Sequence, residues 1–135
     1  MPELPFPDDV RALLTRPNPA VVTTLRSDGQ PISVATWYLL EDDDRVLLNM
    51  DDSRVRLKHL RRDPRVTLTI LDENSWYTHV SLIGRVEGLT PDDGLADIDR
   101  LSTQYTGKEY PDRESPRSSA WLVVEKWHGW GAAKS

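Results

Sequence analysis

The chain has 135 residues, no cysteine and a formal net charge of -5 at pH 7, and its length is typical of one domain, here residues 1–135. The lack of cysteine excludes disulfides and cysteine-bound metal, and it suits a reducing cytoplasm, where we expect the protein to act. The acidic charge argues against a nucleic-acid partner, and no apolar run approaches the ~20 residues of a membrane helix, so we expect neither nucleic acid nor membrane as a partner.

β-Hairpins dominate the first half of the chain. A short helix is expected over residues 8–15. Residues 20–25 and 32–38 are rich in strand-forming types, and the Asp28-Gly29 dipeptide between them tolerates the positive φ of a tight turn. Residues 45–50 predict a third strand after an acidic turn.

A basic segment follows the third strand. We expect a helix with its N-cap at Ser53 that ends before Asp63-Pro64, because a residue before proline disfavours the helical region. Val55 and Leu60 are expected to face the core, with Leu57 close to that face. The basic residues of the segment are Arg54, Arg56, Lys58, His59, Arg61, Arg62 and Arg65.

The second half predicts three more strands and one more helix. Residues 65–71 and 78–89 form two strands, and Gly84 indicates a bulge or bend in the second. A helix is expected over residues 91–106, and residues 120–130 form the last strand after a polar loop. About six mostly antiparallel strands with short peripheral helices predict an α+β fold, in which closure into a barrel removes exposed sheet edges.

The basic helix would suit an anion. Residues three and four apart share a helix face, so one stripe can hold Arg54, Lys58, Arg61 and Arg62. The positive start of the helix and the planar arginine side chains would suit a phosphate or phosphodiester near Ser53, Arg54, Arg56 and Lys58. The alternative is a solvated helix face that pairs with the surplus acidic residues, which is the more common role of a lone basic helix.

An ordered set of motifs resembles one protein family. The motifs are Asn18-Pro19-Ala20, the Asp28-Gly29 turn, residues 31–38 with the sequence VATWY, the Arg-x-Arg-x-Lys run from Arg54 and the RRDPRV segment at residues 61–66. Together they resemble the pyridoxamine-phosphate-oxidase-like split β-barrel superfamily, and more narrowly its actinobacterial deazaflavin-dependent oxidoreductases. The resemblance covers residues 18–88, and it reaches the C-terminal third only through the order of the strands.

This resemblance implies a homodimeric split barrel that binds the deazaflavin coenzyme F420. The basic helix would hold the phosphodiester and the polyglutamate tail, and the second strand would line the ring. His59 departs from the family pattern, since relatives often carry asparagine there. The implied cofactor-binding residues are Ser33, Val34, Ala35, Thr36, Trp37, Asn49, Met50, Ser53, Arg54, Arg56, Lys58, His59, Trp76 and Tyr77.

The implied reaction is hydride transfer from reduced F420 to an activated double bond of a hydrophobic small molecule, such as an enoate or a quinone. No residue is an obvious catalytic acid: Tyr38, Tyr77 and His79 are the available proton donors, and solvent is an equal candidate. Two alternatives stay open. One is an oxidoreductase of the same fold that binds FMN, whose phosphate would need the same helix, and the other is a non-catalytic module that binds a cofactor or haem.

The other groups of functional residue types in the sequence give weaker predictions. The three histidines, His59, His79 and His128, lack metal-ligand spacing, so no metal site is expected. A hydrolase is not indicated, because the nucleophile motif Gly-x-Ser-x-Gly does not occur. The aromatic residues near the C-terminus are expected to pack in the core or in a dimer interface, with the wall of a substrate pocket as the alternative. They are Trp121, Trp127, His128 and Trp130.

Overall fold

A computed structural model describes residues 1–133, which form seven strands and three α-helices. The strands make one antiparallel sheet in the order β2-β1-β5-β6-β7-β4-β3. The elements are α1 Asp8–Leu14, β1 Ala20–Leu25, β2 Pro31–Thr36, β3 Leu39–Leu40, β4 Val46–Asp51, α2 Val55–Arg62, β5 Arg65–Asp72, β6 Ser75–Pro91, α3 Ala96–Thr106, β7 Arg117–Trp130 and the 3-10 turn η1 Gly131–Ala133.

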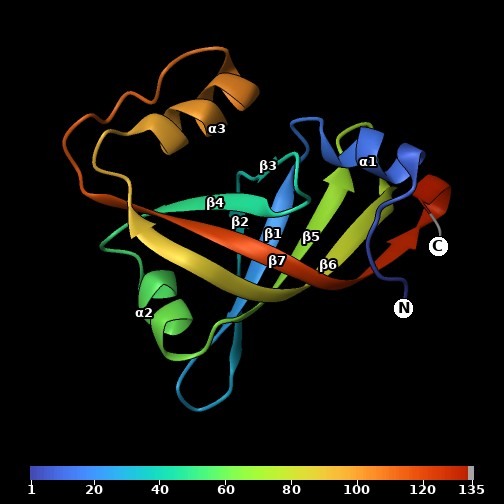
Figure 1. The fold of residues 1–135 in the computed structure, drawn as a ribbon, viewed down its shortest axis with the longest axis horizontal. Helices are drawn as coiled ribbons and strands as arrows, with labels where there is room; N and C mark the ends of the chain where they lie inside the picture. Colours follow the sequence, from blue (N-terminus) through green and yellow to red (C-terminus); the bar gives the residue numbers. More distant parts are fainter. Residues whose placement is uncertain (134–135) are drawn as a thin grey trace.

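The sheet curls around a single main core into a split β-barrel, which confirms the predicted α+β class. Val22, Leu68, Leu82 and Trp127 point inward from four neighbouring strands, and each is at most 3 % exposed. Figure 1 shows α2 and α3 near the end of β6 and the start of β7, whereas α1 and both termini lie at the other end of the sheet. The two ends of the barrel therefore carry different helices.

Several boundaries differ from the prediction, and two of them shape the site. β6 continues to Pro91, which pairs with Ser118 of β7, so α3 begins at Ala96 and not at residue 91. β7 begins at Arg117, before the expected start at residue 120. Residues 117–119, which were expected to be loop, are therefore strand. The additional two-residue strand β3 raises the number of strands to seven among the described residues.

The bulge expected at Gly84 is confirmed. The pairing of β6 with β7 shifts register between Ile83 and Gly84. A Cβ atom on Gly84 would lie 1.9 Å from the carbonyl oxygen of Val123, so β7 passes too close for any side chain at this position. The bulge requires glycine because of this close approach.

α2 packs on the sheet with a different face from the expected one. Leu57 and Leu60 are buried as predicted, but Val55 is 56 % exposed and His59 is buried in its place. The Nδ1 atom of His59 lies 2.9 Å from the hydroxyl oxygen of Thr24 on β1. This polar pair joins α2 to the sheet, and the prediction of an inward Val55 is wrong.

The start of α2 also differs from the prediction. The N-cap is Arg54 rather than Ser53, and no side chain caps the helix. The backbone N–H of Ser53 instead donates to the Oδ1 atom of Asp51 at 2.8 Å. This local turn competes with the helix, which is a common effect of aspartate, and it delays the first helical residue to Val55.

Candidate functional site

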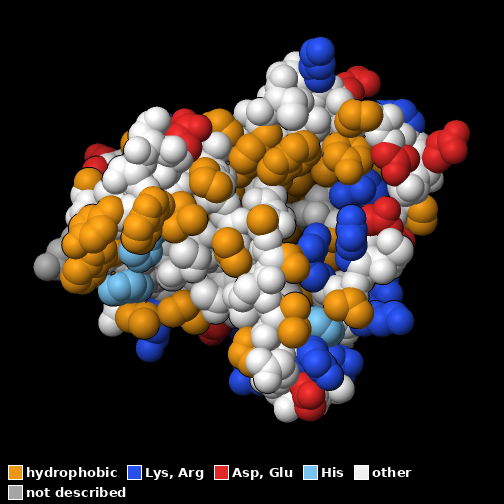
Figure 2. Space-filling view, turned by 180° about the vertical axis from the view of Figure 1, so that it is seen from behind, with side chains coloured by type: hydrophobic (Ala, Val, Ile, Leu, Met, Phe, Trp, Pro, Cys, Tyr) orange, Lys and Arg blue, Asp and Glu red, His pale blue; other side chains and the backbone are white. Residues whose placement is uncertain are grey.

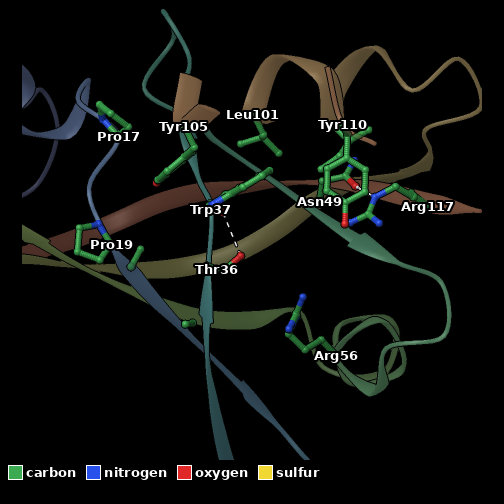
Figure 3. Close-up of a pocket in the computed structure, with 13 residues that line it drawn as sticks. Pro17, Pro19, Thr36, Trp37, Asn49, Arg56, Leu101, Tyr105, Tyr110 and Arg117 are labelled. Atoms are coloured by element: carbon green, nitrogen blue, oxygen red, sulfur yellow. Dashed lines mark hydrogen bonds between the residues drawn. The ribbon is translucent and has the colours of Figure 1, made fainter. Parts of the chain in front are cut away.

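A cavity of about 580 Å³ lies beneath α3, between the start of β7, the N-terminal part of α2 and the strands β1 and β2 (Figure 3). Its wall is mostly apolar and aromatic, with two arginines and one asparagine. The lining residues are Pro17, Pro19, Ala20, Ala35, Thr36, Trp37, Asn49, Arg56, Ile98, Leu101, Tyr105, Tyr110 and Arg117.

Three aromatic rings form a continuous wall of the cavity. Trp37 stacks on Tyr105 with ring centroids 5.2 Å apart and an angle of 10° between the planes, and it meets Tyr110 edge-on at 6.1 Å. The hydroxyl of Tyr105 donates to the carbonyl oxygen of Asn18 at 2.6 Å, which fixes the ring. Burial, and then the neighbouring Tyr38, raise the pKa of Tyr105. These flat faces suit a ligand with a ring system.

Arg117 forms the charged end of the same wall. Its side chain is largely buried, and its guanidinium carbon lies 4.7 Å from the ring centroid of Tyr110. Its Nε atom donates to the Oδ1 atom of Asn49 at 2.8 Å. In Figure 3 the Trp37 ring lies between Tyr105 and Tyr110, with Arg117 beside Tyr110. The cavity is therefore aromatic along its wall and cationic at one end.

Asn49 and Asp92 hold Arg117 in place. The Nδ2 atom of Asn49 donates to the Oδ2 atom of Asp92 and to the hydroxyl of Ser119, each at 3.1 Å. Asp92 also accepts the backbone N–H of Ile98 at 2.9 Å, in the first turn of α3. This buried network connects β4, β7 and α3, so the orientation of Arg117 depends on the packing of all three.

The charged end of the cavity carries more positive charge than negative. Burial lowers the pKa of Arg56, and the positive charges of Arg54 and Arg117 lower it further. Hydrogen bonds from Ser53 lower the pKa of the Asp51 carboxyl, and the nearby charges of Arg117 and Arg54 lower it further. No ion pair forms between Arg54, Arg56 or Arg117 and any carboxylate among residues 1–133. A bound anion would relieve the repulsion among these cations.

The structure brings five of the predicted site residues together, because Ala35, Thr36, Trp37, Asn49 and Arg56 line the cavity. Ala35 and Thr36 lie on β2 and Trp37 directly follows it, whereas Asn49 lies on β4 and Arg56 on α2. Trp37 is also part of the aromatic wall, and Asn49 is also part of the polar network around Arg117.

The other predicted residues of β2 and β4 lie outside the lining. The hydroxyl of Ser33 is 2.7 Å from that of Thr23 on the outer face of the sheet. Val34 packs against the main core, and Met50 is only 2 % exposed. Met50 follows Asn49 on β4, but its side chain is part of the main core, whereas Asn49 lines the cavity.

The remaining predicted residues lie on α2, around its start, or at the start of β6. Ser53, Arg54 and Lys58 are exposed around the start of α2, whereas His59 on the same helix faces Thr24. Trp76 and Tyr77 are exposed and lie at the start of β6. This part of β6 pairs with the C-terminal end of β7, whereas the cavity lies at the N-terminal end of β7.

None of the three expected proton donors lines the cavity. Tyr38 is fully buried, and its hydroxyl donates to the carbonyl oxygen of Arg16 at 2.9 Å. Burial raises the pKa of Tyr38 to about 12. Tyr77 and His79 belong to the start of β6, at the end of the sheet that faces away from α2 and α3.

The sequence-based analysis missed Arg117, Tyr105 and Tyr110. Tyr105 was part of a predicted helix and the other two of a predicted polar loop, with no role assigned to any of them. No local alternation marks the start of β7, because residues 117–120 are all buried, and Pro116 and a charged loop come directly before them. Their convergence with Trp37 depends on long-range packing.

Among residues 1–133, no helix is long and apolar enough to cross a membrane, and no cluster of His, Asp or Glu side chains has the geometry to hold a metal ion.

Comparisons with known proteins agree with this architecture. The family model for pyridoxamine 5'-phosphate oxidase matches residues 6–131. The chain is similar in structure to an F420 reductase, with a TM-score of 0.80 and 24 % identity over 90 % of this chain and 97 % of that one. A conserved hypothetical protein from Mycobacterium tuberculosis gives a TM-score of 0.76 and 22 % identity, over 95 % and 86 % of the two chains.

A heme-binding protein from Mycobacterium smegmatis also shares the fold. Its TM-score is 0.71 at 20 % identity, and the match covers 95 % of this chain but 56 % of that one. No curated protein matches the chain. At these identities the structural matches establish the fold, and the ligand must be argued from the cavity itself.

Proposed function

The chain belongs to the pyridoxamine 5'-phosphate oxidase family, and we propose that it is an oxidoreductase that binds coenzyme F420 in the cavity beneath α3. The observation that carries the proposal is the junction of two surfaces in one cavity. Arg56 has no carboxylate partner among the described residues, and the rings of Trp37, Tyr105 and Tyr110 line the same cavity. An anionic cofactor with a flat ring needs both surfaces.

The positive surface extends beyond the cavity, which favours F420 over FMN. Arg54 and Lys58 are exposed near Arg56 on α2. Figure 2 shows Lys and Arg side chains gathered between α3 and α2 on this side of the molecule. A single terminal phosphate needs few of these cations, whereas a phosphodiester followed by several carboxylates can use a longer row.

When bound, reduced F420 supplies a hydride to the electrophilic carbon of an activated double bond, a proton adds to the adjacent atom, and the cofactor is left oxidised. The protein holds the two reactants in contact in the aromatic cavity. The hydroxyls of Tyr38 and Tyr105 are committed to backbone carbonyl groups, so they are poor proton donors. We assign the proton to water, which reaches the cavity from its open side.

The substrate class follows from the same wall. Apart from the arginines, Asn49 and Thr36, the cavity presents rings and aliphatic side chains, among them those of α3. A hydrophobic acceptor with an activated double bond, such as an enoate or a quinone, would pack against them. A haem-binding module is less well supported, since no histidine lines the cavity and the hydroxyl of the lining Tyr105 already donates to the Asn18 carbonyl oxygen.

We further propose that the protein acts as a homodimer through the outer face of β1, β2, β5 and β6. The register places a set of uncharged, partly or fully exposed side chains on this face, and Figure 2 shows its centre occupied by uncharged types. The set is Val21, Thr23, Ser33, Ala35, Thr67, Thr69, Ser81 and Ile83. Ala35 also lines the cavity, so a second copy on this face would extend the cavity wall.

Turnover tests the proposal. Purified protein is mixed with reduced F420 and a panel of enoates and quinones, and the return of oxidised F420 absorbance is followed. We expect oxidation that requires both protein and acceptor. Binding of F420 without turnover by any acceptor would indicate a non-catalytic module, and turnover with reduced FMN alone would indicate the flavin enzyme of the same fold.

A further inference from the structure

Arg117 enters the cavity from β7, a different element from the cationic start of α2, and we propose that it binds a carboxylate of the substrate. The substrate class is then an apolar carboxylic acid with a ring system. The chemistry of the acid's double bond rests on the proposed function, whereas recognition of the acid itself does not need the cofactor.

The orientation of Arg117 supports this role. Its Nε atom is already used by Asn49, which is in turn held by Asp92 and Ser119. The two terminal nitrogens make no hydrogen bond or ion pair with residues 1–133, although the side chain is only 9 % exposed. A buried guanidinium with a fixed orientation and two free donors matches the two oxygens of a carboxylate, and leaving it unpaired is costly.

The aromatic wall specifies the rest of the ligand. The row begins at Arg117 and continues through Tyr110 at 4.7 Å, Trp37 at 6.1 Å from Tyr110, and Tyr105 at 5.2 Å from Trp37. A ligand whose anion pairs with Arg117 would lay its body along these rings, as Figure 3 allows the reader to follow. Charge at one end and an apolar surface along the rest fit an amphiphilic acid better than a neutral hydrocarbon or a polyanion.

Two anions can be held here without competing for one cation. Arg56 comes from α2, where Arg54 and Lys58 continue the positive surface, whereas Arg117 comes from β7 beneath α3. The charges of Arg54 and Arg117 both act on Arg56, so the two groups of cations are neighbours. The cofactor's anionic tail on α2 and the substrate's carboxylate on Arg117 would each remove part of this repulsion, and the reacting groups would share the space between them.

A matched pair of ligands tests the assignment on the cofactor-free protein. 2-Naphthoate and 2-naphthamide have the same ring body and differ in charge, and isothermal titration calorimetry gives a Kd for each. The variants are Arg117→Met and, as a control, Arg26→Met, which removes an exposed arginine of the β1–β2 turn that pairs with Asp28. The Kd of each variant for F420 is measured in parallel.

We expect wild type and Arg26→Met to bind naphthoate at least about 10-fold more tightly than naphthamide, and Arg117→Met to lose that preference. The affinity of Arg117→Met for naphthamide and for F420 should change by less than about 3-fold. Equal binding of the two probes by wild type would overturn the proposal by itself. The test therefore does not depend on whether Arg117→Met folds.

The outcomes also separate this inference from the proposed function. If Arg117→Met loses F420 affinity while its preference for naphthoate persists, Arg117 belongs to the cofactor and the inference is wrong. If wild type prefers naphthoate through Arg117 but does not bind F420, the acid site stands and the proposed cofactor is wrong.

Discussion

Individual polar side chains behind the cavity wall are buried and paired, and Asn18 is central to them. The hydroxyl of Tyr105 donates to the Asn18 carbonyl oxygen, and the Asn18 side chain accepts the backbone N–H of Glu73 at 3.1 Å. Tyr38 lies in the same group, with its hydroxyl bonded to Arg16. These bonds join the segment after α1 to the β5–β6 turn and to α3, so they support the ring of Tyr105 from behind.

The buried hydroxyl of Tyr38 predicts a loss of stability at high pH. Burial raises its pKa from the ordinary 10.0 to about 12 in the folded protein. Above pH 10 the unfolded chain releases the proton while the folded protein keeps it, so stability is fully present below pH 10 and falls as the pH rises through 12. The slope from this residue is at most about 1.4 kcal/mol per pH unit.

The comparison of wild type with Tyr38→Phe isolates this effect, since Tyr105 is present in both. The variant loses the hydroxyl's hydrogen bond, which costs about 1 kcal/mol at neutral pH. We expect its free energy of unfolding in urea to approach that of wild type between pH 10 and 12. A difference that stays constant over this range would contradict the buried, neutral Tyr38.

At the residue scale the sequence predicted which side chains share a cavity better than it predicted their hydrogen-bond partners. Trp37, Asn49 and Arg56 were expected to hold one ligand, and all three line one cavity, whereas the identity of that ligand stays a prediction. The sequence could not indicate that Asn49 would bond Arg117, because 68 positions separate them. Such pairs are set by strand register and not by local pattern.

At the scale of elements, local turn chemistry made the hairpins predictable. Gly29 has a φ of 84°, as the turn between β1 and β2 requires, and Gly84 forms the expected bulge. The start of α3 was not predictable in the same way. Pro91 suits the first turn of a helix, but here it pairs with β7, and Asp92 is held by Asn49 while it bonds the first turn of α3.

Gly84→Ala should destabilise the barrel strongly, because the new methyl group would meet the Val123 carbonyl oxygen at 1.9 Å. We expect a loss of about 2 kcal/mol or more in the free energy of unfolding, measured in urea. Gly94→Ala is the matched control, since nothing lies within 4 Å of its Cβ position and its φ is not positive. Equal stability of the two variants would contradict the close approach of β6 and β7.

The basic start of α2 predicts a loss of cofactor binding without a loss of fold. Replacing Arg54, Arg56 and Lys58 together by alanine should weaken F420 binding by about 10-fold or more, which is about 1.4 kcal/mol. Thermal unfolding should barely change, because none of the three is fully buried.

A second triple variant controls for net charge. It removes Arg26, Arg61 and Arg85, which are exposed and do not line the cavity. If both triple variants bind F420 equally poorly, net charge alone explains the loss and the start of α2 has no specific role. If both bind F420 as well as wild type does, the start of α2 does not hold the cofactor.

At the scale of the whole molecule, the uncharged outer face of the sheet predicts a dimer in solution. Thr67 lies near its centre, between Thr23 on β1 and Ile83 on β6. Thr67→Glu would bring two like charges close together across a two-fold axis and bury them, so we expect the variant to elute as a monomer by size exclusion with light scattering. Thr103→Glu, on the exposed side of α3, should leave the dimer intact.

A Thr67→Glu variant with the same mass in solution as wild type would show that this face is not the interface. A wild-type monomer would remove the proposed partner altogether, and the cavity of one chain would then have to bind the cofactor unaided.

The class of fold was predictable because hairpin signals, helix spacing and strand number all agreed on an antiparallel barrel. The cavity was not, since its lining combines residues of α2, α3 and the start of β7, which are far apart in the sequence. Trp127 fills the core as expected, whereas Trp130 is 40 % exposed. Two similar tryptophans near one end of the sequence thus have different surroundings, which only the completed barrel determines.

One titration tests the central claim, that this barrel is built for a deazaflavin. Purified wild-type protein is titrated with F420, FMN and haem, and binding is followed by quenching of tryptophan fluorescence, with Trp37 as the reporter in the cavity wall. We predict saturable binding of F420 and at least about 10-fold weaker binding of FMN and haem. Tight binding of FMN or haem, with no binding of F420, would contradict it.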